Sequence, residues 1–157
     1  MPVLPGTVAE PGSSEMIMSV SWPAGMTAAG CARRCVRGWL GDARGLDLGD
    51  VELMVSELVT NACEHSGRPH GRVSLVAVCG PERLRVEVTD AGGGTVPAPR
   101  RPDADDVRGR GLLIVAALSD GWGHLADPDT GARTVWVELA RRPAPDGDAS
   151  RHGRPTN

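Results

Sequence analysis

The chain has 157 residues, a length that suits one domain with one hydrophobic core. Hydrophobic residues make up 40% of it and charged residues 24%, and a net charge of −3 gives no basic footprint for direct nucleic-acid binding. No apolar run approaches the roughly 18–20 residues that a membrane span needs, and the N-terminus has no signal pattern. We therefore expect a cytoplasmic protein without membrane contact.

All 17 basic residues are arginine, and this absence of lysine excludes several reaction schemes. The Walker A phosphate loop requires a lysine, and so does the phosphate-binding strand of eukaryotic-type protein kinases. A Schiff-base mechanism is excluded as well. Any nucleotide chemistry in this chain must use another arrangement.

The first half of the chain predicts a strand and two helices. Residues 1–14 contain proline, glycine and serine without periodicity, and we expect a flexible arm there. A strand is expected at 15–22 and a helix at 24–40. Asp47 is a plausible N-cap of a second helix that continues to His65. The apolar residues of this helix have the spacing of one buried stripe: Val51, Val55, Leu58, Val59 and Ala62.

The second half predicts the rest of an antiparallel sheet. Strands at 72–79 and 83–89 flank the turn signal Gly80-Pro81-Glu82, and apolar residues alternate with charged ones in the second strand. A mobile loop at 91–108 precedes a helix at 111–118. Two further strands follow at 121–126 and 133–140, and a disordered tail is expected at 142–157.

These elements predict one α/β domain over 15–141. Its architecture should be a two-layer sandwich, in which helices cover one face of a mainly antiparallel sheet.

Three short segments contain the residues that suggest chemistry, and the first is Glu57-Leu-Val-Thr-Asn61. Four residues apart on a helix, Glu57 and Asn61 share one flank, turned away from the apolar stripe. A carboxylate and an amide oxygen side by side can hold Mg²⁺ and position a nucleophile. Taken alone, the same two residues could simply lie on a solvated helix face.

The second segment is Asp90-Ala-Gly-Gly-Gly94, which follows an alternating strand. A carboxylate at a strand end can accept a hydrogen bond from an exocyclic amine, and the glycines let the backbone approach a ligand closely. A glycine-rich turn without a ligand is the alternative.

The third segment, Gly109-Arg-Gly-Leu112, opens the helix expected at 111–118. Free backbone N–H groups at a helix start, approached over glycine, form a site for phosphate. A plain junction between loop and helix is the alternative.

In this order, the three segments resemble the N, G1 and G2 boxes of the GHKL ATPase superfamily, which includes gyrase and the histidine kinases. The run Ser56-Glu-Leu-Val-Thr-Asn-Ala62, followed by His65, is especially similar to the small anti-sigma-factor serine/threonine kinases of bacteria. The resemblance covers residues 15–140 and implies the Bergerat ATP-binding fold.

The resemblance also implies roles for individual residues. Asn61 would ligate Mg²⁺, Glu57 would act as the general base, and Asp90 would bond the adenine amine. The remaining positions implied to bind ATP are Gly92, Gly94, Gly109, Arg110, Gly111, Leu112 and Thr134. Of these, Thr134 would support the side chain of Asp90.

Two functions follow as expectations. The first is an ATP-binding serine/threonine protein kinase that phosphorylates a small anti-anti-sigma regulator, with Mg²⁺ bound and, by the family pattern, as a homodimer. The second is an ATP-dependent binding module that sequesters a sigma factor or another regulator without effective phosphotransfer. Retention of Glu57 favours the kinase, because ATP binding alone does not need a general base.

Overall fold

The computed structural model describes residues 6–8, 15–66, 71–92 and 110–142. Most of the expected N-terminal arm, the expected loop from residue 93 onward and the expected tail from residue 143 onward lie outside them. The strands are β1 (Gly6–Val8), β2 (Met16–Pro23), β3 (Arg72–Cys79), β4 (Arg83–Asp90), β5 (Gly121–Ala126) and β6 (Arg133–Ala140). The helices are α1 (Ala28–Leu40), α2 (Leu48–His65) and α3 (Gly111–Leu118).

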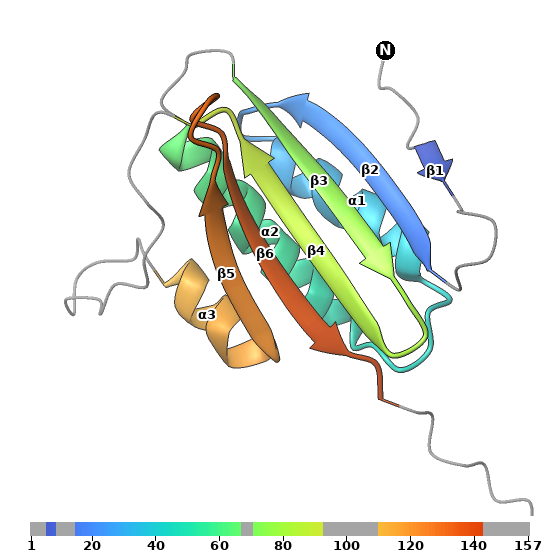
Figure 1. Ribbon diagram of the computed structural model, residues 1–157. Helices are drawn as coiled ribbons and strands as arrows, with labels where there is room; N and C mark the ends of the chain where they lie inside the picture. The colour runs from blue at the N-terminus through green and yellow to red at the C-terminus, as the bar shows by residue number, and fades with distance from the viewer. Residues whose placement is uncertain (1–5, 9–14, 67–70, 93–109, 143–157) are drawn as a thin grey trace, which may run out of the picture.

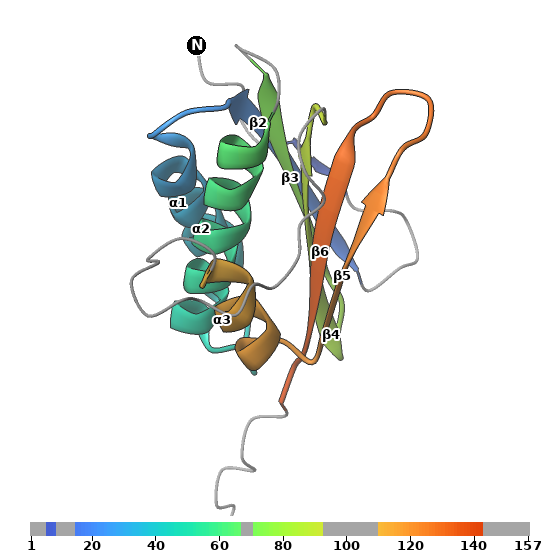
Figure 2. The same ribbon diagram turned by 90° about the vertical axis from the view of Figure 1, so that its left-hand side faces the viewer.

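The strands form one antiparallel sheet in the order β1-β2-β3-β4-β6-β5. Figure 1 shows how the strands lie next to one another, and Figure 2 shows α1, α2 and α3 packed on one face of the sheet. The predicted two-layer α/β sandwich is therefore confirmed.

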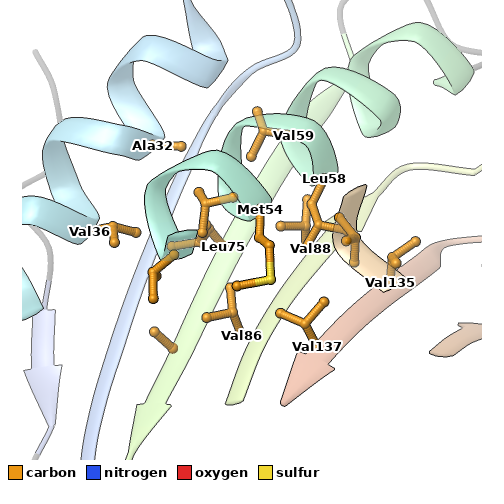
Figure 3. Close-up of a cluster of buried hydrophobic side chains, with 14 of the residues drawn as sticks. Ala32, Val36, Met54, Leu58, Val59, Leu75, Val86, Val88, Val135 and Val137 are labelled. Carbon is orange, nitrogen blue, oxygen red and sulfur yellow. The ribbon is translucent and has the colours of Figure 1, made fainter. Parts of the chain in front are cut away.

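Helix α2 lies in the middle of the helix layer and contacts both α1 and α3. Asp47 caps it as predicted, because its Oδ1 accepts a hydrogen bond from the backbone N of Asp50 at 3.1 Å. The predicted apolar stripe is buried, and Met54 is buried beside it. Figure 3 shows Met54 directed toward the strands near Val86. Burial of each Val, Leu or Met side chain contributes roughly 1.5–3 kcal/mol to the stability of the fold, so the stripe decides which side of α2 faces the sheet.

Two features differ from the sequence-based expectation. Within the expected arm, Gly6–Val8 forms the short strand β1, which pairs with β2 from Gly6 opposite Ser19 to Val8 opposite Ile17. Helix α1 begins at Ala28 rather than Ala24, because a turn comes first, in which the backbone N of Ala28 donates to the carbonyl of Gly25. Strand β1 was not predicted because three residues are too few to show a periodic pattern.

The other face of the sheet carries a stacked aromatic side chain. The indole of Trp136 lies over Gly123 of β5, where an added Cβ would come within 2.7 Å of the ring. The Arg85 guanidinium lies 4.3 Å from the centre of the same indole. Arg85 also bonds Glu87 and Glu138 on this face, at 2.7 and 2.9 Å. Strand β5 thus gains side-chain packing from its neighbour where glycine supplies none.

Gly92, directly after β4, meets the turn between β5 and β6. Its φ is +75°, and an added Cβ would overlap the carbonyl group of Gly131. Asp127 shapes this turn by accepting hydrogen bonds from the backbone N–H groups of Thr130 and Asp129, and these bonds lower the pKa of its carboxyl. Gly92 therefore lies in close approach to the protein's own backbone at this turn.

We predict that Gly92→Ala destabilises the fold more than Gly131→Ala. Both glycines have φ above +70°, so each alanine pays a left-handed backbone cost of about 1–2 kcal/mol. Only Gly92→Ala adds a steric conflict, of about 1–3 kcal/mol, because an added Cβ at Gly131 has nothing within 4 Å. Denaturant unfolding of the two variants measures the difference, and equal losses would contradict the contact between Gly92 and the turn.

Candidate functional site

Helix α2 presents a polar flank beside its buried stripe. Glu57 and Asn61 lie one turn apart on this flank, and both are partly exposed. The side chains of Leu58 and Ala62, each one residue further along, are buried in the core. Burial of the stripe therefore turns Glu57 and Asn61 out of the core together.

Glu57 reaches the first residue of α3. An added Cβ on Gly111 would overlap Oε2 of Glu57, and it would lie 3.3 Å from Cδ of the same side chain. The missing side chain at Gly111 thus lets a carboxylate lie against the start of α3. Because the N-terminus of a helix favours negative charge, this position suits an anion.

Asp90 is the last residue of β4 and is 5% exposed. Its Oδ1 accepts a hydrogen bond from the backbone N of Gly92 at 2.6 Å. The β4–β6 register sets Arg133 directly opposite Asp90. Nη2 of Arg133 lies 3.3 Å from Oδ2 of Asp90 and 3.4 Å from Oδ1. Asp90 is thus a buried carboxylate with a buried arginine as its counter-charge.

Arg133 was missed by the sequence-based reasoning. Its Nη2 also donates to the backbone carbonyl of His65 at 2.5 Å, which links β6 to the last residue of α2. The alternation of β6 contained the signal: Arg133 lies two residues before the buried Val135 and so faces the core. A charged residue on the buried face of a strand requires a partner.

The same alternation corrects the prediction for Thr134. Successive side chains of a strand point to opposite faces, so Thr134 faces away from Asp90. Its hydroxyl lies 2.7 Å from that of Thr89 on the sheet face without helices. The structure brings Arg133, and not Thr134, to the carboxylate of Asp90.

The remaining predicted residues fall into three groups. Gly94 and Gly109 lie outside the described residues. Arg110 is exposed at the N-cap position of α3, next to Gly111. The side chain of Leu112 is buried in the hydrophobic core, and the binding of ATP at this position stays a prediction.

The described residues fit a magnesium–nucleotide complex in their donor chemistry. Glu57 and Asn61 offer oxygen ligands of the kind that Mg²⁺ prefers, and the start of α3 suits phosphate. No cluster of three or more His, Cys, Asp or Glu residues suited to a metal occurs among the described residues. A protein site with few ligands is typical of Mg²⁺ bound through nucleotide phosphates and water.

No described helix is long and apolar enough to cross a membrane.

The two-layer sandwich and the polar flank of α2 fit a nucleotide-binding domain, and comparison with known proteins identifies the family. The sequence pattern of the family described as "Histidine kinase-like ATPase domain" matches residues 23–142. The match covers more than half of the chain, and the chain belongs to this family. Membership implies that the domain binds ATP. No curated protein matches the chain.

A solved structure has the same fold. The crystal structure of the RsbU and RsbW domains of Rv1364c from Mycobacterium tuberculosis matches with a TM-score of 0.61 and 24% sequence identity. The match covers 82% of this chain and 33% of that one, so this chain spans about a third of that chain's length. The catalytic domain of histidine kinase ThkA matches with a TM-score of 0.49 and 14% identity, over 78% of this chain and 95% of that one.

We predict an energetic coupling between Gly111 and Glu57. Gly111→Ala should displace the Glu57 carboxylate, and its effect on the free energy of unfolding should change by about 0.5–1 kcal/mol when Glu57 is also replaced by Ala. The coupling is small because the long Glu57 side chain can rotate away. Denaturant unfolding of the single and double variants measures it.

Gly38→Ala is the matched control. Gly38 lies in α1, and an added Cβ there has nothing within 4 Å. Its effect should be the same with Glu57 or Ala at position 57. An equal effect of Gly111→Ala in both backgrounds would show that the two residues do not touch.

Proposed function

We propose that this protein is an anti-sigma-factor-type serine/threonine kinase, which transfers phosphate from ATP to a small anti-anti-sigma protein. The observation that carries the proposal is the contact of the Glu57 carboxylate with Gly111 at the start of α3. It sets a candidate general base beside a candidate phosphate site. Binding of ATP without transfer does not require a base at this point.

The order of residues along α2 is consistent with a nucleotide that binds in an extended conformation parallel to the helix. Glu57 contacts Gly111, Asn61 follows one turn later, and the carbonyl of His65 is bonded to Arg133 beside Asp90. Eight residues of α-helix rise about 12 Å. The phosphates then lie near Glu57 and Gly111, and the adenine lies near Asp90.

In this arrangement the chain supplies position and charge. Asn61 would be the protein ligand of Mg²⁺, which would supply positive charge beside the phosphates. Backbone N–H groups at the start of α3 face the phosphates, with the cationic Arg110 at the N-cap position. Glu57 accepts the proton of the incoming serine hydroxyl and orients its oxygen for attack.

The proposed partners are proteins. The solved relative from Mycobacterium tuberculosis has RsbU and RsbW domains, and the resemblance of residues 56–62 to the anti-sigma-factor kinases supports an anti-anti-sigma substrate. A sigma factor is a second proposed partner, and two copies of the chain are proposed to form a homodimer.

We predict that Asp90→Asn abolishes ATP binding, because the buried carboxylate is the proposed acceptor for the adenine amine. Calorimetric titration with Mg·ATP measures the affinity. Asp120→Asn is the matched control: Asp120 accepts a hydrogen bond from the backbone N of Ala140, the last residue of β6, whereas Asp90 lies opposite the first residue of the same strand. Normal affinity in Asp90→Asn would remove Asp90 from the nucleotide site.

We predict that Glu57→Ala keeps ATP binding and loses phosphotransfer by about 10²–10⁴-fold, the usual contribution of a general base. The measurement uses purified protein, ATP labelled on the γ-phosphate and a soluble extract of the source organism. Glu64→Ala is the control, because Glu64 is exposed on the same helix. Label on a small protein that disappears only with Glu57→Ala is the expected result.

Two other outcomes would change the assignment. Unchanged transfer in Glu57→Ala would remove Glu57 as the base. No transfer by the unmodified protein, despite measured ATP binding, would favour the binding module that sequesters a regulator.

A further inference from the structure

Arg133 is a buried cation at the adenine end of the proposed site. Its side chain is 6% exposed, and that of Asp90 is 5% exposed. Nε of Arg133 lies 3.4 Å from Oδ1 of Asp90, and Nη2 lies 3.3 Å from Oδ2. The proposed mechanism leaves this arginine without a role, although burial of a charge is costly unless the charge is paired.

The distances compare the contacts that Arg133 makes with two of the described residues, Asp90 and His65. Charge-assisted hydrogen bonds are usually about 2.7–2.9 Å long, and its contacts with Asp90 are longer. Its bond to the carbonyl of His65 is 2.5 Å. Arg133 is therefore anchored on the C-terminal end of α2, and it supports Asp90 from that anchor.

Asp90 keeps acceptor capacity under this arrangement. The two oxygens of a carboxylate offer about four lone-pair sites. Oδ1 receives the short bond from the backbone N of Gly92 and the longer contacts from Arg133. Oδ2 contacts only Nη2 of Arg133 among the described residues. A further donor can therefore bind at Oδ2 without displacing the arginine.

We propose that Arg133 is a positioning residue that holds the Asp90 carboxylate in one orientation, so that Oδ2 accepts the 6-amino group of the purine base. This inference rests on the proposed ATP site. Through His65, the arginine also fixes this acceptor relative to α2, the helix that carries Asn61 and Glu57.

The test separates the amine from the rest of the nucleotide. The triphosphate of purine riboside differs from ATP only in lacking the 6-amino group. Loss of a hydrogen bond to a charged group lowers affinity by about 10–100-fold, so the unmodified protein should prefer ATP by that ratio. Calorimetric titration of both ligands with Mg²⁺ gives the ratio for each variant.

R133M removes the charge and the fork of donors from a side chain of similar length. It should weaken ATP binding, change the affinity for purine riboside triphosphate little and bring the ratio close to one. R133K keeps the charge, but a single ammonium group cannot contact the Asp90 carboxylate and the His65 carbonyl as a planar fork does. Its ratio should lie between those of R133M and the unmodified protein.

R141M is the matched control. Arg141 also donates to backbone carbonyls, those of Arg44 at 2.8 and 3.0 Å and of Gly80 at 2.6 Å, but it lies just beyond the other end of β6. Loss of these bonds should lower the thermal midpoint and leave the ligand ratio unchanged. Circular dichroism establishes which variants are folded, and R133K carries the test if R133M is not.

Three results would overturn the inference. If the affinities for both ligands fall equally in a folded Arg133 variant, the arginine is structural only. If R133K matches the unmodified protein in ratio while R133M does not, charge alone acts and the geometry of the fork does not. If the unmodified protein binds neither ligand, the ATP site itself fails, and the inference fails with it.

Discussion

Burial of one side of α2 is the interaction on which the rest of the structure depends. The stripe from Val51 to Ala62 packs into the core together with Met54, between α1 and α3 and above the strands. Rotation of this helix by one residue would turn its polar flank by about 100° and separate Glu57 from Gly111. The site is therefore positioned by hydrophobic packing, and its polar residues are placed as a consequence.

The sequence predicted the layers of the fold because each layer has a strong periodic signal. The stripe of α2 and the alternation in β4 and β6 are long enough to exclude other patterns, and the Asp47 cap gave the start of α2 to the residue. Strand β1 has three residues and no such signal. It forms because the edge of β2 offers it backbone hydrogen-bond partners, which is a tertiary effect.

The sequence indicated more of the residues of the candidate site than of the contacts between them. Glu57 and Gly111 were each singled out, but that they touch depends on how α3 packs against α2. Thr134 was assigned to Asp90 by resemblance, whereas the strand register gives that position to Arg133. The approach of Gly92 to a ligand stays a prediction, and packing sets this residue against Gly131. In each case the sequence indicated which residues matter, but their contacts depend on packing between elements that are distant in sequence.

The stacked indole of Trp136 has a consequence for the opposite layer. Strand β5 has glycine at two of its six positions, and it is the edge strand nearest to α3, with which it is in contact. An edge strand of this composition has little side-chain packing of its own, so the indole over Gly123 and the guanidinium of Arg85 stiffen it from outside. The packing of α3 against β5 thus depends in part on Trp136 and Arg85, which lie on the opposite face of the sheet and do not contact the site residues.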